Sequence, residues 1–204
     1  MTYILGFHDE KYIYILGDQF VTYRMNGCND SSIYSGAVAE RSSKSAIKIF
    51  TVGKSIFGVA GKINHPKNIY ETYKDRVGQK SLLPDYVDYL ELIKESVRSC
   101  SPFNDYFELL FGFFDQKPKL YHYNSCTNYW IECYEAKSCG SMPENIASII
   151  REDIPTQCAQ LSGSDAIVGV ITAAQLVIQN NTNLCLSGIG GTVHGAFVVE
   201  SRPG

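Results

Sequence analysis

Thr2, the second residue of the chain, has the most direct route to chemistry. Removal of Met1, which cellular aminopeptidases carry out readily before a small residue, would leave Thr2 with a free α-amine. That amine, with an unperturbed pKa of about 7.7–8.0, can take the proton from the threonine's own hydroxyl, directly or through one water. A hydroxyl activated in this way attacks peptide or amide carbonyls. We therefore take Thr2 as the candidate nucleophile.

Such a nucleophile needs three partners, and the sequence supplies a candidate for each. A lysine ammonium keeps the amine neutral, a carboxylate holds the lysine, and a backbone N–H receives the oxyanion. Asp18 lies sixteen residues after Thr2 and ends the next predicted strand, while Lys48 is the single charge in Ala-Ile-Lys-Ile-Phe. Gly61 follows small residues at the end of a later strand. We expect Asp18 and Lys48 to be catalytic and Gly61 N–H to bind the oxyanion.

Strands and helices that must position these residues alternate in blocks along the chain. Runs rich in β-branched and aromatic residues predict two hairpins, Thr2–Phe7 with Lys11–Leu16 and Ala46–Val52 with Ser55–Ala60. Apolar residues spaced by three or four predict helices over 66–77, 84–97, 143–154 and 166–179, the last capped by Ser164 and Asp165. Further strands are expected over 106–114, 120–123, 129–134 and 192–199, the first two joined by an Asp-Gln-Lys-Pro turn.

This order of elements favours one fold class over its main alternative. A Rossmann fold needs one crossover helix for each strand, whereas here runs of strands alternate with pairs of helices. Two sheets between two helical layers accommodate that order. We therefore predict an α/β four-layer αββα sandwich, formed as one domain over residues 1–204, a length that suits a single core.

Composition excludes several other functions. With 18 basic and 21 acidic residues, the chain lacks the basic surface of a nucleic-acid-binding protein. Its longest mostly apolar stretch, Ala166–Ile178, is too short to span a membrane, and the N-terminus does not resemble a signal peptide. Seven cysteines without paired spacing, and four histidines not placed at finger spacing from them, predict free thiols in a reducing cytoplasm. No metal or cofactor is expected.

The motif series resembles a known superfamily. Thr2, then Gly17-Asp18, then Lys48, then Gly58-x-x-Gly61, on strands followed by helix pairs, is similar to the proteasome β-subunit superfamily of N-terminal nucleophile (Ntn) hydrolases. This superfamily includes bacterial ring peptidases that work with an ATPase unfoldase. The resemblance implies a threonine-type peptidase or amidase that acts on a peptide or small amide substrate. It also implies a homo-oligomer, with an ATPase unfoldase as a candidate partner.

The same resemblance assigns two further residues. Gly17-Asp18-Gln-Phe-Val-Thr22 is similar to the family's Gly-Asp-x-x-x-Thr segment, which implies that Thr22 contacts the substrate backbone. Cys139-Gly-Ser141 is similar to its Gly-Ser-Gly, which implies that Ser141 lies near the amine. Each also has an ordinary explanation, because threonine favours strands and serine caps helices such as the one expected near Pro143. Likewise, a glycine at position 61 can serve a strand end that requires positive φ.

The chain departs from the family pattern in two places. The segment between Asp18 and Lys48 is longer than usual, which leaves Lys44 as an alternative to Lys48. Further on, Leu184 stands where the family has an aspartate that completes the network around the amine. Asp165 or a water could replace that acid. Otherwise the alternative function is a non-catalytic, proteasome-like scaffold or binding subunit.

Overall fold

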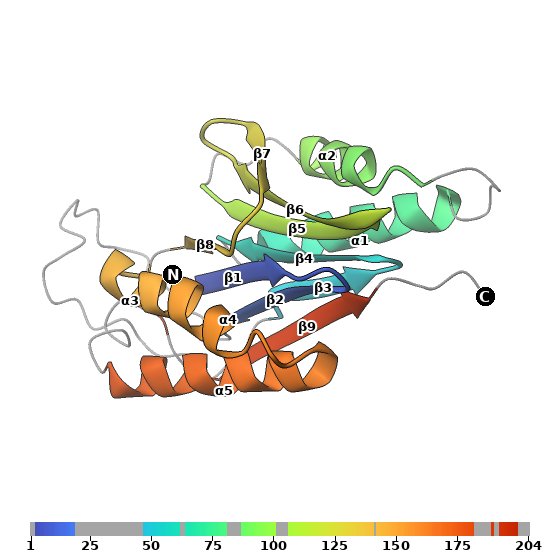
Figure 1. Ribbon diagram of the computed structural model, residues 1–204. Helices are drawn as coiled ribbons and strands as arrows, with labels where there is room; N and C mark the ends of the chain where they lie inside the picture. The colour runs from blue at the N-terminus through green and yellow to red at the C-terminus, as the bar shows by residue number, and fades with distance from the viewer. Residues whose placement is uncertain are drawn as a thin grey trace, which may run out of the picture.

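The protein is described by a computed structural model. The structure describes residues 3–18, 47–61, 64–80, 87–100, 106–140, 142–181, 189 and 192–199. Within these residues the molecule forms four layers, in which two β-sheets pack face to face and helices cover the outer face of each (Figure 1). The expected αββα sandwich is therefore confirmed. The assignment of the whole chain to one domain stays a prediction.

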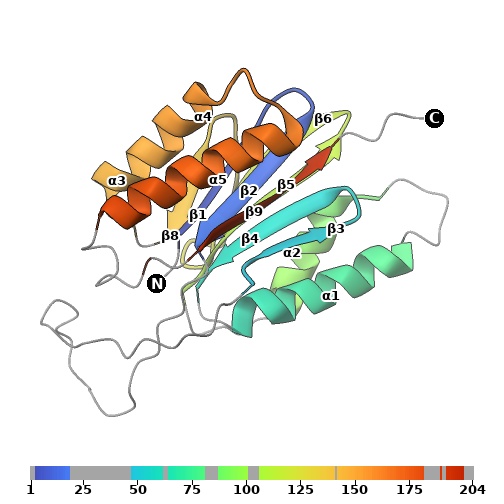
Figure 2. The same cartoon turned by 90° about the horizontal axis from the view of Figure 1, so that it is seen from below.

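One sheet contains the start of the chain. Among the described residues it has four strands in the order β8-β1-β2-β9, all antiparallel. Helices α3 and α5 cover its outer face, with a π-helical turn and α4 between them (Figure 2). The elements are β1 (Tyr3–His8), β2 (Tyr12–Asp18), β8 (Lys137–Gly140), α3 (Glu144–Ser148), the π-helical turn (Ile149–Asp153), α4 (Ile154–Gln157), α5 (Gly163–Asn180) and β9 (Val193–Val199).

The other sheet is covered by the first helix pair. Its five described strands run in the order β3-β4-β5-β6-β7, again antiparallel, with α1 and α2 on the outer face. The elements are β3 (Ile49–Val52), β4 (Ser55–Ala60), α1 (Asn64–Lys80), α2 (Tyr89–Ser99), β5 (Glu108–Asp115), β6 (Lys117–Asn124) and β7 (Tyr129–Cys133).

Three apolar cores hold the layers together, and strand alternation decides which side chain enters which core. In β1, Tyr3 and Leu5 face the helices, whereas Ile4 faces the second sheet. The central strands β4 and β5 are buried on both faces, so their sequences are almost continuously apolar. These two strands could be predicted from the sequence because each is a short run of apolar residues.

Several predicted boundaries were wrong, each for a local reason. Asp-Gln-Lys-Pro is not a separate loop, because Gln116 alone makes the turn at a φ of 60° and Asp115 pairs with Lys117. Helix α5 begins at Gly163 with Ser162 as its N-cap, ahead of the expected start. The short edge strand β8 was missed, since Lys-Ser-Cys-Gly carries little strand signal. The predicted 143–154 helix is interrupted by the π-helical turn and continues to Gln157.

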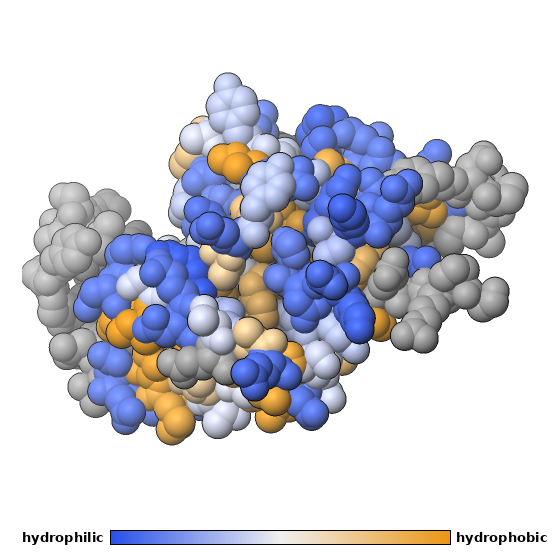
Figure 3. All heavy atoms as spheres, in the orientation of Figure 1, coloured by the Kyte–Doolittle hydropathy of each residue, from blue (hydrophilic) through white to orange (hydrophobic). Residues whose placement is uncertain are grey.

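The surface is mostly polar in the orientation of Figure 1. In Figure 3, apolar side chains gather over the helices that cover the first sheet, where Ile149, Val168 and Leu176 are exposed.

Among the described residues, no helix combines the length and the apolar character needed to cross a membrane. Five of the seven cysteines are described, and all five are free thiols, as expected: Cys100, Cys126, Cys133, Cys139 and Cys158.

Candidate active site

Polar residues from both sheets meet at one end of the sandwich, where β1 begins and β2 ends. The antiparallel register brings Ile4 opposite Gly17, and Tyr3 opposite Gly140 at the end of β8. The second sheet contributes Lys48, just before β3, whose carbonyl accepts a hydrogen bond from Val59 N. We call this end of the molecule the site end, and the opposite end, where β1 turns into β2, the turn end.

Asp18 and Lys48 form a buried ion pair that links the two sheets. Asp18 Oδ1 accepts hydrogen bonds from Lys48 Nζ at 3.1 Å and from Tyr3 N at 2.8 Å. The side chains are 0% and 7% exposed. Burial lowers the pKa of Lys48, while Asp18 acts in the opposite direction and favours the ammonium. The carboxylate thus fixes both the backbone at the start of β1 and the position of a lysine with a weakened hold on its proton.

The structure describes some of the predicted site residues and leaves others outside its described ranges. Asp18 and Lys48 are brought together, and this contact favours Lys48 over Lys44 as the partner of Asp18. Thr2, Thr22, Ser141, Lys44 and Leu184 lie outside the described residues. Their chain neighbours are described: Tyr3 follows Thr2, Gly140 precedes Ser141, and these two neighbours pair with each other. The catalytic roles of Thr2, Asp18, Lys48 and Ser141 and the substrate contact of Thr22 stay predictions.

Gly61 directly follows β4 at the site end. It is not among the described glycines with positive φ, so the explanation that it ends a strand in a left-handed conformation is wrong. The requirement is one of space, because a Cβ at this position would lie 2.6 Å from Phe107 Cβ and 3.2 Å from Phe107 Cα. Close packing against the start of β5 therefore fixes the backbone that would donate the predicted oxyanion N–H.

Glu108 forms a second link between the sheets that sequence reasoning missed. This residue begins β5, and its Oε2 accepts a hydrogen bond from Gly140 N at 2.9 Å. Its Oε1 lies 3.1 Å from His122 Nε2, and both side chains are buried. Burial alone would raise the pKa of Glu108, but the bonds from His122 and Gly140 outweigh it and lower the pKa. Gly140 has a φ of 109°, a conformation that favours glycine, so β8 ends in a fixed geometry.

His194 is a half-buried polar residue at the site end. It is the second residue of β9 and pairs with Gly17, next to Asp18. Both ring nitrogens are buried, and neither has a side-chain hydrogen-bond partner among the described residues. Burial lowers the pKa of His194, as does the nearby Lys48, while Asp18 and the backbone of Gly17 act in the opposite direction.

One sequence signal could have found two of the missed residues. Lys48 was selected as a lone charge among apolar neighbours, and Glu108 stands in the same way within Phe-Glu-Leu-Leu-Phe. His122, in Tyr-His-Tyr, is a weaker case of the same pattern. In contrast, nothing in the sequence around His194 predicts that β9 lies beside β2, because that pairing joins segments far apart in the chain.

Asp165 cannot replace the acid that the family has near the amine. It lies in the first turn of α5, and the neighbouring Gly163 N donates to Tyr14 Oη at 3.0 Å. Tyr14 lies near the start of β2, whereas Asp18 ends that strand. The four residue steps from Tyr14 to Asp18 cover about 13 Å of strand, so Asp165 belongs to the turn end. That suggestion from the sequence was wrong.

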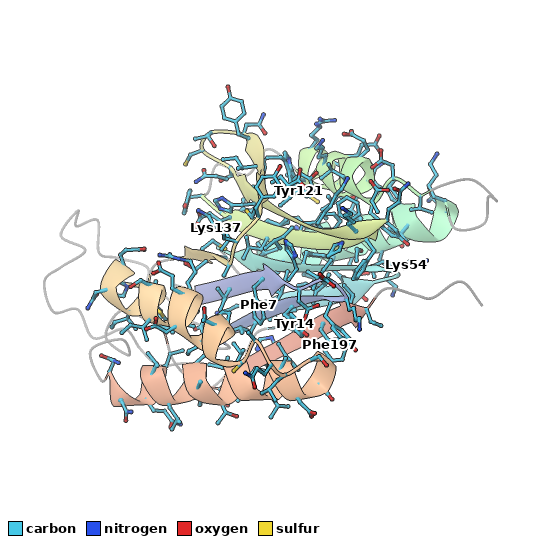
Figure 4. The ribbon with its side chains drawn as sticks, in the orientation of Figure 1. Phe7, Tyr14, Lys54, Tyr121, Lys137 and Phe197 are labelled. Carbon is cyan, nitrogen blue, oxygen red and sulfur yellow. The ribbon has the colours of Figure 1, made fainter. Side chains whose placement is uncertain are left out.

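A cavity of about 440 Å³ lies at the site end beside the start of β1. Its walls include Tyr3, Glu108, Gly140 and Arg151, with Lys137 on β8 (Figure 4). The Tyr3 hydroxyl is buried and has no hydrogen-bond partner among the described residues. No group of three or more potential metal ligands occurs in the described part of the chain. The cavity is therefore bounded by hydrogen-bonding groups, and one of its walls is Tyr3, which directly follows Thr2.

Comparison with solved structures agrees with this architecture. The crystal structure of eukaryotic HslV from Trypanosoma brucei matches 98% of this chain and 100% of its own chain, with a TM-score of 0.60 and 13% sequence identity. No protein-family model matches the sequence, and no curated protein matches it. The chain therefore has the fold of HslV, a proteasome β-like Ntn hydrolase. The predicted resemblance is confirmed at the level of the fold.

Proposed function

We propose that the protein is an N-terminal threonine hydrolase that cleaves peptide or amide bonds. The observation that carries this proposal is the buried Asp18 carboxylate, which binds Lys48 Nζ and the backbone N of Tyr3 together. Tyr3 follows the candidate nucleophile directly, so the pair lies at the start of β1 within a fold that it shares with HslV. A buried ion pair with a perturbed lysine is typical of a functional site.

In the proposed reaction, the free amine of Thr2 removes the proton from Thr2 Oγ as that oxygen attacks the substrate carbonyl carbon. Positive charge on Lys48 keeps the amine neutral and able to accept the proton. Gly61 N–H stabilises the negative charge on the carbonyl oxygen. The amine then passes its proton to the leaving nitrogen as the C–N bond breaks. Water hydrolyses the resulting ester and restores Thr2.

The experiment compares the wild-type chain with Thr2→Ala and Thr2→Ser on fluorogenic peptides, after intact mass spectrometry has established whether Met1 is removed. Loss of hydrolysis in Thr2→Ala and retention of part of it in Thr2→Ser are expected, because serine keeps a hydroxyl nucleophile. Thr51→Ala, on the exposed side of β3, is the matched control and should hydrolyse like the wild type. Retained Met1, or equal rates in Thr2→Ala and the wild type, would rule the proposal out.

One observation favours the alternative function, a non-catalytic scaffold or binding subunit. Leu184 stands where the family has an acid, and Asp165, the suggested replacement, belongs to the turn end. A scaffold would bind peptides without cleaving them and would not react with an epoxyketone, which requires both the amine and the hydroxyl of an N-terminal threonine. Labelling of the wild type but not of Thr2→Ala would exclude this alternative.

We further propose that the protein works as a homo-oligomer, with an ATPase unfoldase as a candidate partner. Exposed apolar residues support a subunit interface: Val168 and Leu176 on α5, and Tyr129 and Ile131 on the edge strand β7. Light scattering coupled to size exclusion measures the assembly directly. A mass near the 22.7 kDa of one chain at micromolar concentration would contradict it.

A further inference from the structure

His194 has a defined position that the proposed reaction does not use. Strand alternation along β9 places Gly195 against Ile167 and Ile171 of α5, and Val198 in the core between the sheets. The side chain of His194 therefore faces the second sheet. That inter-sheet space is also where Lys48 crosses to reach Asp18.

The ionisable surroundings of His194 are few. Asp18 on β2 and Lys48 before β3 both act on its charge state. Neither β4 nor the described part of β3 carries an ionisable side chain, and the single one on α5, Asp165, lies at the turn end. Within the described residues, the charge of His194 thus depends on burial, on the Lys48–Asp18 pair and on the backbone of Gly17.

Buried imidazole nitrogens without a side-chain partner need an explanation. Neither nitrogen of His194 has a side-chain hydrogen-bond partner among the described residues, and the backbone of Gly17 is the one hydrogen-bonding group that acts on the ring there. The neutral ring instead places an uncharged group beside the Lys48–Asp18 ion pair. When that ring gains a proton, a second cation competes with Lys48 for the single carboxylate of Asp18.

We propose that His194 is a positioning residue of the Lys48–Asp18 pair, which leaves the pair intact while the ring is neutral and disrupts it when the ring is protonated. The effect on hydrolysis rests on the proposed function. The charge coupling among the three residues does not, so the two can be tested separately.

The direct test follows the titration of His194 by NMR of its imidazole carbons in the wild type, Lys48→Met and Asp18→Asn. Loss of the lysine charge should raise the titration midpoint of His194, and loss of the carboxylate should lower it. Equal midpoints for His194 in the three proteins would overturn the proposal.

A second measurement does not depend on the folding of those two variants. His194 has a pKa below its ordinary 6.5 in the folded protein, so its stabilising contribution is complete above pH 6.5 and is lost as the pH falls below that value. His194→Gln lacks this titration. The difference in unfolding free energy between wild type and His194→Gln should therefore shift against the wild type on going from about pH 8 to about pH 5. A difference that does not change with pH would contradict the coupling.

The activity readout separates this inference from the proposed function. Protonation of both His194 and the Thr2 amine should give the wild type an acid limb of kcat/KM steeper than that of His194→Gln, which retains the amine titration alone. At alkaline pH the two rates should agree within about threefold. Identical acid limbs would refute a role in hydrolysis. If the wild type were inactive, the proposed function would fail, and the NMR and stability results would still decide the charge coupling.

Discussion

The two ends of the sandwich are held by opposite kinds of chemistry. At the turn end, rings pack against each other beside the helices: Phe7 stacks on Tyr14 at 4.7 Å, and Tyr12 meets Phe197 edge-on at 5.7 Å (Figure 4). Tyr14 Oη also donates to Asp9 Oδ2 at 3.1 Å. At the site end, the Lys48–Asp18 and Glu108–Gly140 bonds cross between the sheets instead.

This difference bears on the stability of the fold and on the proposed function. Aromatic packing, with a hydrogen bond at its edge, stabilises a fold at little cost. Buried ion pairs, in contrast, contribute little net stability, because removing charges from water costs about as much as their attraction returns. Among the described residues, the buried Lys48–Asp18 pair lies at the site end, beside the start of β1, where the proposed function requires it. Four substitutions test that contrast.

The largest effect is expected for Lys48→Met. This change leaves the Asp18 carboxylate buried without its ammonium partner, which should lower the unfolding free energy by about 3 kcal/mol and abolish peptide hydrolysis. Urea unfolding and a fluorogenic peptide assay measure the two effects. Lys54→Met, in the exposed turn of the same hairpin (Figure 4), is the matched control and should change neither. Unchanged stability in Lys48→Met would mean that the ion pair does not hold the site end.

Glu108→Leu should come next, with a loss of about 2 kcal/mol, because Gly140 N and His122 lose their acceptor. Glu108→Gln keeps an acceptor and should lose less. The folded pKa of Glu108 lies below its ordinary 4.5, so the advantage of the wild type over Glu108→Gln is complete above pH 4.5 and decreases as the pH falls below it. Unfolding curves across that range check the sign, with the exposed Glu10→Gln of the turn end as the control. A pH-independent difference would contradict an ionised Glu108.

Gly61→Ala should cost about 1–2 kcal/mol, because the new Cβ meets the start of β5 and forces the backbone apart. Hydrolysis should fall with it, since the predicted oxyanion N–H moves. Gly78→Ala gives the opposite sign: this glycine lies inside α1 with open space around it, and alanine favours helix by up to about 1 kcal/mol. Equal effects of the two substitutions on thermal unfolding would count against close packing at Gly61.

The smallest effect belongs to the turn end. Tyr14→Phe removes a hydroxyl that bonds Asp9 and Gly163 N, and should cost about 1 kcal/mol while the ring stays packed. Hydrolysis should not change, because Tyr14 lies far from Asp18 along β2. A reduced kcat in Tyr14→Phe with normal stability would show that the turn end and the site end are coupled, which would contradict their separate roles.

How much could be predicted from the sequence follows from how local each feature is. Hairpins such as Ile49–Val52 with Ser55–Ala60 join neighbouring segments around a glycine turn, so their composition was sufficient to predict them. The buried faces of α1 and α2 showed the helical period for the same reason. In contrast, β8 pairs with β1 from the other half of the chain, and its four residues have little strand propensity of their own.

The sequence by itself determined the block order of strands and helices, and with it the four layers, because apolar periodicity is a local property. It also determined two candidates: Asp18, by its position sixteen residues after Thr2 at the end of the next strand, and Lys48, as a lone charge among apolar neighbours. Only the tertiary structure brought Glu108, Gly140 and His194 to the same end, and only it placed Asp165 at the other. These placements depend on which strands pair across the sheets, and that choice is made by packing between segments far apart in the chain.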